Sequence, residues 1–389
     1  MSKKNIREVT PAIETFANIK VVGVGGSGNS AINRMVKSKI RGVEFIAINT
    51  DAQALHHSIA PSKVHIGRET TKGLGAGMDP ELGAKSAEEN EQDILKALEG
   101  ANMVFITCGL GGGTGSGAAP IIADIARELN ALTVAVVTKP FTFEGLQRKD
   151  IADRSFEHLI DKVDAVITIP NDRLLQIIDK KTSLLEAFSI VDEVLKQGVQ
   201  GISEVITVPG LINVDFADVK AIMSQAGSAL MGIGTASGEN RAVEAAKAAI
   251  NSPLLELNIN GATGVLFTIA GGPDLTMFEV NEVAEIITSA CDADAKIIFG
   301  AIVDEDLKDD IKVTVIATGF REAKENKGEV GATQPLISNH ELFAKKAEAR
   351  TIKKAFKKEE TEEDITIPKS KEEEQLDMPT FLRNKMKKR

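Results

Sequence analysis

The sequence contains no Trp and no Tyr, and aromatic residues make up only 4% of it. A platform on which nucleic-acid bases stack needs exposed aromatic rings, so a nucleic-acid partner is not expected. Cysteine is also scarce: Cys108 and Cys291 are the only two, and they lie in apolar runs far apart in the sequence. This spacing predicts neither a disulfide framework nor a metal cluster, and we assign no metal-ligating residues. A reducing cytosol is the simplest setting for such a chain.

Long apolar runs are missing as well. No run reaches the length of a transmembrane helix, and the first 17 residues lack the apolar core of a signal peptide. We therefore expect a cytoplasmic protein that does not insert into a membrane. The apolar content of 43% over 389 residues is enough for two domains with substantial cores.

Glycine, by contrast, is abundant, and its densest stretch is GLGGGTGSG at residues 109–117. The stretch follows an apolar run at 103–108, which predicts a buried strand, and precedes an apolar helix that opens at Ala118. Backbone without Cβ atoms can approach a ligand closely, and the N–H groups of a helix N-terminus suit a phosphate. The stretch lacks the Lys-Ser/Thr ending of a P-loop. It therefore predicts a phosphate cradle of another type, in preference to a flexible surface turn.

Two further glycine-rich segments, residues 23–28 and 72–80, lie at a predicted strand end and before a predicted helix. The chain alternates apolar strands with helices, which predicts an α/β fold with a parallel, Rossmann-like sheet covered on both faces. Ligands of such sheets bind outside the carboxyl ends of the strands. Three glycine loops are more than one pyrophosphate needs, so the pattern favours a mononucleotide with several phosphates.

One alternative stays open at this point. Gly23-x-Gly25-x-x-Gly28, followed by Asp51 at the end of the next predicted strand, also fits the dinucleotide fingerprint. Glycine-rich turns of this kind serve many different phosphates. An NAD-binding oxidoreductase that uses the 23–28 loop is therefore the alternative hypothesis.

A capping box at Ser183 and Glu186 predicts the start of a long helix, which ends before Pro-Gly at 209–210. On this helix Phe188 and Asp192 are four residues apart and can face one ligand. The ring would stack on a base, and the carboxylate would accept the two adjacent N–H donors that guanine offers. A core Phe beside a solvated Asp is the other interpretation.

Polar side chains also follow two other predicted strands. Glu144 and Arg148 come after the strand at 133–137 and share a helix face, so they form either a surface ion pair or part of a ligand site. Asn171 stands at the exit of the strand at 166–170.

Two acids, Asp215 and Asp218, precede a predicted helix at 219–225. Carboxylates at a helix N-terminus usually cap it, but they can also hold a hard cation or position water. They lie well outside the glycine-loop sheet. The chain that follows, to about residue 321, mixes helices and strands as a smaller α/β or α+β domain without an evident catalytic site of its own.

Beyond residue 321 the periodicity gives way to blocks of Lys and Glu, which predict a disordered linker over residues 322–375. The linker ends in an apolar island at 376–383, which is most simply a partner-binding peptide. The four basic residues after it are too few to anchor the chain to a lipid surface by themselves.

The stretch at 109–117 resembles the tubulin signature loop, and the flanking motifs are similar to those of the FtsZ branch of the tubulin/FtsZ family. The similarity runs from about Ile19 to Phe320 and resumes at residues 376–383. It implies binding of GTP and GDP, for which we expect Mg²⁺ as a companion ion. The domains implied are a flexible extension (1–17), a GTP-binding domain (18–182), a central helix (183–208), a GTPase-activating domain (209–321), a disordered linker (322–375) and a partner-binding peptide (376–389).

The resemblance also implies roles for the candidate site residues. Glu144 and Arg148 would reach the ribose and phosphate region, while Asn171, Phe188 and Asp192 would hold guanine. In the first glycine segment, Ser30 stands where the family usually carries Asn, and Asn29 lies one position earlier. The residues assigned to the phosphate end are Gly25, Gly26, Ser27, Asn29, Gly111, Gly112, Gly113, Thr114 and Gly115.

Finally, the segment with Asn213, Asp215 and Asp218 resembles the family's catalytic synergy loop, which completes the GTPase site of the neighbouring subunit. This implies a head-to-tail homopolymer whose assembly activates hydrolysis, in the ring at the midcell division site. The peptide from Asp377 to Arg383 resembles the tail that binds membrane-tethering and regulatory division proteins. A nucleotide-binding scaffold that does not polymerise remains a third hypothesis.

Overall fold

The computed structural model describes residues 17–176, 178, 181–208, 210–253, 255, 259 and 261–320. The expected N-terminal extension up to residue 16, the linker at 322–375 and the peptide at 376–389 lie outside these residues. The strands are β1 (Ile19–Val24), β2 (Val43–Asn49), β3 (Ser62–His65), β4 (Met103–Gly109), β5 (Leu132–Lys139), β6 (Ala165–Pro170), β7 (Gly227–Ser237), β8 (Gly264–Gly271), β9 (Lys296–Val303) and β10 (Asp310–Thr318). The helices are α1 (Gly25–Lys37), α2 (Ala52–His57), α3 (Pro80–Glu89), α4 (Glu91–Leu98), α5 (Gly113–Glu128), α6 (Leu146–Ile160), α7 (Asn171–Leu174), α8 (Leu184–Thr207), α9 (Phe216–Met223), α10 (Arg241–Ile250) and α11 (Met277–Ser289), with short 3-10 turns at Thr142–Glu144 and Glu305–Leu307.

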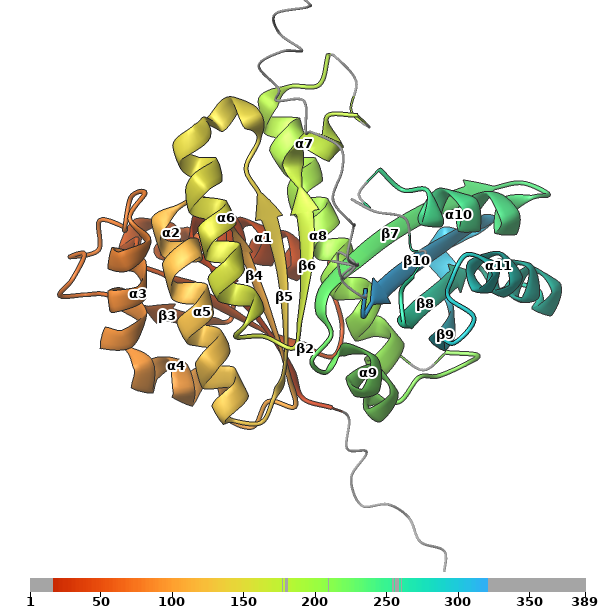
Figure 1. The fold of residues 1–389 in the computed structure, drawn as a ribbon, viewed down its shortest axis with the longest axis horizontal. Helices are drawn as coiled ribbons and strands as arrows, with labels where there is room; N and C mark the ends of the chain where they lie inside the picture. Colours follow the sequence, from red (N-terminus) through yellow and green to blue (C-terminus); the bar gives the residue numbers. More distant parts are fainter. Residues whose placement is uncertain are drawn as a thin grey trace, which may run out of the picture. The chain divides into compact units, whose positions relative to one another are not determined.

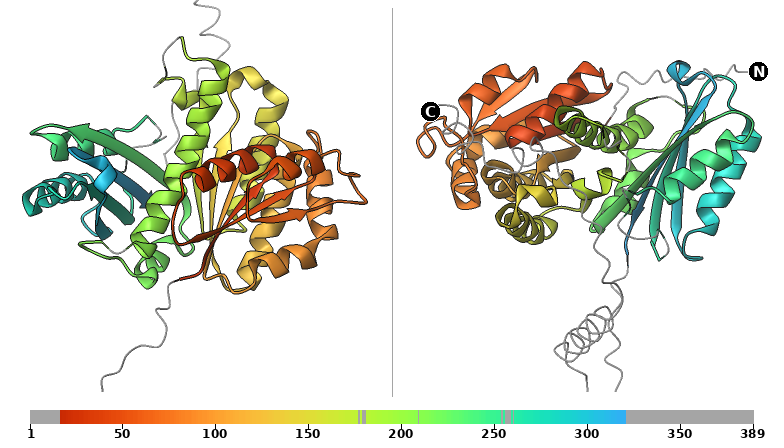
Figure 2. Two further views of the ribbon diagram at one scale, coloured as in Figure 1. Left: turned by 180° about the vertical axis from the view of Figure 1, so that it is seen from behind. Right: turned by 90° about the horizontal axis from the view of Figure 1, so that it is seen from above.

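The described strands form one ten-stranded sheet in the order β3-β2-β1-β4-β5-β6-β7-β10-β8-β9 (Figure 1). From β3 to β7 every neighbouring pair is parallel. The side chains of β1 are buried along its whole length, as expected for a strand between two layers of helices. Helices α1 and α8 cover one face of the sheet, and α3 to α6 cover the other (Figure 2). A separate apolar core fills the space between the sheet and the helices on each face. The expected α/β fold with a parallel sheet is confirmed.

Helix α8 links this sheet to the second half of the chain. Its N-cap Ser183 accepts from Glu186 N, and the Glu186 carboxylate accepts from Ser183 N, which confirms the predicted capping box. The helix has 24 residues and therefore spans about 36 Å. Leu195, Val199 and Ile202 of α8 are fully buried against the sheet.

Strand β7, which the sequence analysis did not predict, joins the two halves of the sheet. It pairs in parallel with β6 and antiparallel with β10, which in turn pairs antiparallel with β8. Its sequence, GSALMGIGTAS, is rich in small residues and lacks the β-branched pattern of a strand. The structure explains two of its glycines. A Cβ at Gly232 or Gly234 would collide with the carbonyl oxygen of Ala249 or Ala245, so these glycines let α10 pack directly on the strand.

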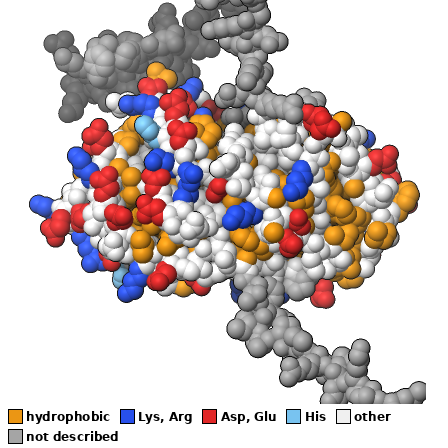
Figure 3. Space-filling view, turned by 60° about the horizontal axis from the view of Figure 1, so that its bottom comes forward, with side chains coloured by type: hydrophobic (Ala, Val, Ile, Leu, Met, Phe, Trp, Pro, Cys, Tyr) orange, Lys and Arg blue, Asp and Glu red, His pale blue; other side chains and the backbone are white. Residues whose placement is uncertain are grey.

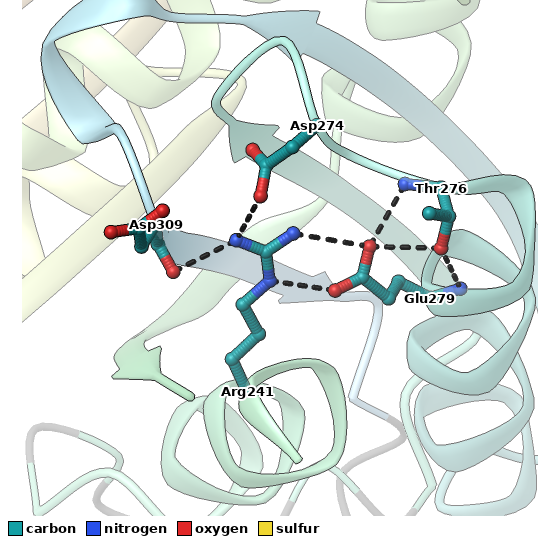
Figure 4. Close-up of polar contacts among 5 residues, drawn as sticks. All are labelled: Arg241, Asp274, Thr276, Glu279 and Asp309. Atoms are coloured by element: carbon teal, nitrogen blue, oxygen red, sulfur yellow. Dashed lines mark hydrogen bonds and ion pairs between the residues drawn. The ribbon is translucent and has the colours of Figure 1, made fainter. Parts of the chain in front are cut away.

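In the second half, one guanidinium group connects several elements (Figure 4). Arg241, the first residue of α10, is buried, and its Nε donates to Glu279 Oε1 at 2.6 Å. Its Nη1 donates to the carbonyl oxygen of Asp309 at 2.8 Å and lies 2.8 Å from Asp274 Oδ2. Glu279 also closes the capping box of α11 with Thr276. The hydrogen bond from Arg241 lowers the pKa of Glu279 below its usual value.

Replacing Arg241 should therefore destabilise the protein. We expect Arg241→Met to lower the free energy of unfolding by about 3 kcal/mol, because Glu279 would remain partly buried without its cation. The loss should shrink in acid, since a carboxylate with a lowered folded pKa contributes stability that disappears as the pH falls through that pKa. Urea denaturation at several pH values measures both effects. Lys247→Met, at an exposed position of the same helix, is the control; equal denaturation midpoints for the two variants would contradict the assignment.

Candidate functional site

A cavity of about 400 Å³ lies at the carboxyl ends of β1, β4, β5 and β6. This is the edge at which ligands of parallel sheets bind. The first turns of α1 and α5 form one wall, and the side chains of Asn171, Phe188 and Asp192 form another. Twelve of the fourteen residues predicted to bind nucleotide line the cavity: Gly25, Gly26, Ser27, Gly112, Gly113, Thr114, Gly115, Glu144, Arg148, Asn171, Phe188 and Asp192.

Much of the glycine-rich stretches at 23–28 and 109–117 forms the first turns of helices. Helix α5 begins at Gly113 rather than at Ala118, and α1 begins at Gly25 directly after β1. The N–H groups of these first turns have no partner within the helix, and both helix N-termini reach the cavity wall. Backbone N–H groups and two positive helix ends are the donors that a chain of phosphates needs.

The glycines of this wall serve two purposes. A Cβ at Gly113 would lie 2.8 Å from carbonyl oxygens of the 76–79 segment, and one at Gly117 would collide with the carbonyl oxygen of Pro80. These positions are glycine because α5 packs against the start of α3. A Cβ at Gly26 or Gly112, in contrast, would meet no protein atom within 4 Å. At these two cavity positions protein packing does not require glycine, which leaves the approach of a ligand as the reason.

Two predicted phosphate-end residues, Gly111 and Asn29, do not line the cavity. Gly111 has φ +102, and a Cβ there would lie 2.8 Å from the carbonyl oxygen of Arg148. Its N–H donates to Ser116 Oγ at 2.9 Å, so the Ser116 hydroxyl stabilises the turn between β4 and α5.

The structure places Ser30, and not Asn29, on the cavity wall. Asn29 is buried between the ends of β1 and β2. With its amide oriented to satisfy its neighbours, it donates to the carbonyl oxygen of Gly23 at 2.8 Å and accepts from Asn49 Nδ2 at 3.0 Å. Asn29 therefore fixes the strand–helix junction under the wall.

Glu144 and Arg148 both line the cavity and also pair with each other. Arg148 Nη1 donates to Glu144 Oε2 at 2.6 Å, and Glu144 Oε1 accepts from the backbone N–H of Phe141 at 2.9 Å. Glu144 and Arg148 therefore form an ion pair and also line the cavity, so the two interpretations of this pair are compatible.

The opposite end of the cavity combines an aromatic face with two oxygen acceptors. Phe188 is 40% exposed and packs edge-on against Phe141, with ring centroids 5.8 Å apart. Asn171 is buried, and among the described residues its Oδ1 has no hydrogen-bond partner. Burial raises the pKa of Asp192 to about 6, against the opposing effect of Arg34, whose Nη2 lies 3.8 Å from Asp192 Oδ2. Such a slot suits a flat ring that carries N–H donors on one edge.

The acidic segment lies elsewhere. Asp215 is the N-cap of α9 and accepts from Asp218 N at 2.9 Å, so α9 begins at Phe216, three residues before the predicted start. Asn213 Oδ1 accepts from Gly210 N at 2.6 Å. All three side chains are exposed, and none lines the cavity. Helix α9 lies at the other end of the strands from α7, so one copy of the chain does not bring the two sites together (Figure 1).

Asp51, the acid of the dinucleotide fingerprint, is occupied as a helix cap. Its Oδ1 accepts from the backbone N–H groups of Gln53 and Ala54 at the start of α2, and Asp51 does not line the cavity. This arrangement gives the NAD hypothesis no support.

The sequence left the choice between Asn29 and Ser30 open, and it did not indicate the lining residues Thr138, Pro140 and Val191. Thr138 and Pro140 stand at and just beyond the carboxyl end of β5, so the rule on strand ends could have indicated them. Within the described residues no helix is both long and apolar enough to cross a bilayer. No group of three or more His, Cys, Asp or Glu in the same residues is placed to hold a metal ion.

Comparison with known proteins agrees with this geometry. Residues 18–179 match the Tubulin/FtsZ family, GTPase domain, and residues 227–321 match the FtsZ family, C-terminal domain. An empty FtsZ dimer from M. jannaschii is 48% identical, with a TM-score of 0.76 over 78% of this chain and 89% of that chain. The GDP-bound CetZ1 monomer from Haloferax volcanii is 21% identical, with a TM-score of 0.69 over 79% and 96% of the two chains. The GTPγS-bound CetZ2 protofilament from the same organism is 22% identical, with a TM-score of 0.68 over 87% and 99%. The two CetZ structures share the fold.

The surroundings of Asp192 lead to a direct test of the slot. We expect its carboxyl group to titrate near pH 6 in the free protein and Arg34→Met to raise its pKa further, because the cation opposes the effect of burial. Carboxyl ¹³C NMR over a pH series measures both values. Lys37→Met, an exposed cation on the same helix, should leave the titration unchanged. An unchanged pKa of Asp192 in Arg34→Met would show that the two groups do not interact.

Proposed function

Because this chain belongs to the tubulin/FtsZ family of GTPases, we propose that it hydrolyses GTP between subunits of a head-to-tail filament. One observation carries the proposal. A cavity with two helix N-termini, an aromatic ring and two oxygen acceptors lies at one end of the strands, while the acidic segment is exposed at the other end. Each half of the site is therefore ready to be completed by a second copy.

The cavity favours a guanine nucleotide. Guanine presents adjacent N–H donors on its Watson–Crick edge, and Asn171 Oδ1 and the Asp192 carboxylate are the acceptors available to them. Phe188 would stack on the ring. The first turns of α1 and α5 would bind the phosphates, with Gly26 and Gly112 leaving room for them. Mg²⁺ would be held mainly by the phosphates and water, as is usual when phosphates supply its oxygen ligands.

Hydrolysis needs little covalent help from the protein. Phosphoryl transfer depends on positioning and on stabilisation of developing charge. We assign Asp215 and Asp218 of the neighbouring subunit, with Asn213 beside them, to position water or the cation at the phosphate. A contact in which one end of a subunit meets the opposite end of the next need not close, and it then produces a filament. The FtsZ dimer and the CetZ2 protofilament show that similar proteins self-associate.

Exposed apolar side chains stand beside both halves of the site. Phe143, Leu146 and Leu185 are 62–79% exposed and are neighbours in sequence of the cavity residues Glu144, Arg148 and Phe188. In the other half, Leu211 is 63% exposed and lies two residues before Asn213, while Met277 and Phe278 are exposed at the start of α11. Figure 3 shows hydrophobic side chains gathered on the right of its view, over the second half of the chain. Apolar surfaces of this kind mark sites of protein–protein contact.

We further propose that the filament belongs to the cell-division ring at midcell, in the cytoplasm. The similarity to FtsZ at 48% identity, against 21% for CetZ1, supports this role. The peptide from Asp377 to Arg383 would recruit membrane-tethering and regulatory proteins. A scaffold that binds GTP without polymerising is the competing hypothesis, and light scattering distinguishes the two.

The shared site predicts how turnover depends on assembly. GTP hydrolysis per molecule should rise with protein concentration, in parallel with light scattering, when GTP and Mg²⁺ are present. Asp215→Ala should bind GDP as the wild type does and hydrolyse GTP about a hundredfold more slowly, because the positioning group is lost. Phosphate release and GDP titration measure these effects.

Glu88→Ala, which removes an exposed carboxylate of α3, serves as the control and should behave as wild type. A rate per molecule that does not change with protein concentration would contradict the shared site. Loss of GDP binding in Asp215→Ala would place that residue in the nucleotide pocket of its own chain.

The terminal peptide should be separable from the enzyme. We expect a protein truncated before residue 376 to hydrolyse GTP at the wild-type rate, because the residues that we assign to binding and hydrolysis all lie between Gly25 and Asp218. A fluorescent fusion of the truncated protein should no longer be recruited to the division site. Reduced turnover of the purified truncated protein would count against a tail that acts only as a tether.

A further inference from the structure

Asp164 is a side chain outside the cavity to which neither the sequence analysis nor the proposed function assigns a role. It directly precedes β6, whose other end leads into Asn171 at the cavity. Its backbone N–H donates to the carbonyl oxygen of Thr133 at 2.8 Å, and its Oδ2 accepts from Thr133 N at 2.9 Å. Asp164 is thus fixed to the amino end of the parallel sheet.

The remaining acceptors of Asp164 hold the turn that follows α9. Its Oδ1 accepts from Gln225 N at 3.3 Å and from Ser224 Oγ at 3.5 Å. Its carbonyl oxygen accepts from Gly227 N at 3.0 Å. Asp164 of the nucleotide-binding half therefore binds Ser224 and Gln225 of the segment that connects α9 to β7, and also Gly227, the first residue of β7.

That turn needs an external partner. Gln225 has φ +53 and Gly227 has φ +66, so two left-handed residues occur within three positions. A left-handed conformation is unfavourable for a residue with a Cβ and persists when surrounding contacts hold it. The Asp164 carboxylate supplies such a contact at Gln225 itself.

Helix α9 connects this turn to the acidic segment. It has eight residues and is about 12 Å long, with Asp215 at its start and Ser224 at its end. Val219 and Met223 are fully buried, and Thr318 Oγ1 donates to the carbonyl oxygen of Ile222 at 3.2 Å. A short helix with a buried face moves as a rigid body, so a shift at its end changes the position of its start.

We propose that Asp164 is a positioning residue for hydrolysis, because it holds the end of α9 and thereby sets where Asp215 and Asp218 meet the next subunit. This inference rests on the proposed shared site. Asp164 contacts neither the nucleotide nor the reacting atoms. It acts on the site that its own chain offers to a neighbour and leaves the pocket of its own chain unchanged.

The test begins with Asp164→Ala in the full-length protein. GDP affinity should equal that of wild type, and GTP turnover at high protein concentration should fall roughly tenfold or more, because displaced catalytic groups lose much of their effect. Asp161→Ala is the matched control: it removes the same charge from the same turn, at an exposed position. It should retain wild-type turnover.

Mixing experiments identify which half of the site is damaged. Gly112→Asp places a carboxylate in the phosphate cradle and removes GTP binding, but leaves the acidic segment intact. In an equimolar mixture of Asp164→Ala and Gly112→Asp, the Asp164→Ala pockets should recover to about half of the wild-type rate, since half of their neighbours offer an intact acidic segment. A mixture of Asp164→Ala with Asp215→Ala should show no recovery above the reduced rates of the two variants alone. A general loss of stability would not produce this pattern.

Two outcomes overturn the inference: wild-type turnover of Asp164→Ala, or a mixture with Gly112→Asp that recovers no activity. The reference mixture of Asp215→Ala with Gly112→Asp separates this failure from that of the shared site, because it must recover activity if the site is shared at all. If Asp164→Ala does not fold or does not bind GDP, Asp164→Asn replaces it in the same mixtures. Its side chain retains one acceptor oxygen, so we expect it to disturb the fold less than Ala does. Failure of that variant to recover with Gly112→Asp also overturns the inference.

Discussion

The close contact between α5 and the segment that leads into α3 is the constraint on which the rest of the structure depends. At Gly113 and Gly117 the backbone of the helix lies against carbonyl oxygens with no room for a Cβ. This contact fixes the N-terminus of α5 directly above the carboxyl end of β4, beside the N-terminus of α1. The cavity wall that α5 forms and the backbone N–H groups that this wall offers follow from that position. Small residues here are thus a requirement of packing before they are a requirement of binding.

Much of the fold could be predicted because the parallel strands are continuous apolar runs and the polar candidates stand just after them. The placement of Asn171, Glu144 and Arg148 at one edge follows from the common direction of the strands. Strand β7 could not be predicted in this way. Gly232 and Gly234 are required by the close contact with α10, which follows β7 in the chain, and the local sequence pattern does not contain that contact.

Asn29 and Ser30 illustrate a second limit. Neighbouring residues of a helix point about 100° apart, so an error of one residue in helix phase exchanges a buried side chain with one that lines the cavity. The start of α1 is made of glycine and small polar residues, which carry no apolar periodicity to set that phase. The hydrogen bonds to Gly23 of β1 and Asn49 of the adjacent strand β2 show that Asn29 turns toward the sheet, and such tertiary contacts cannot be read from the local sequence. The acidic segment has a different limit: its own residues indicate a helix cap, and its assignment to a neighbouring subunit comes from the family resemblance.

The pairing of β6 with β7 has a mechanical consequence. Three residue pairs join these strands, from Ala165 with Gly227 to Ile167 with Ala229, whereas eight pairs join β7 to β10. A rotation of one half of the sheet against the other is therefore least costly along this seam. Helix α8 lies across it, so close that a Cβ at Gly198 would lie 3.2–3.3 Å from side-chain atoms of both Val136 of β5 and Met231 of β7. We therefore expect the two halves of the sheet to move as stiff units about this seam, with α8 packed against both.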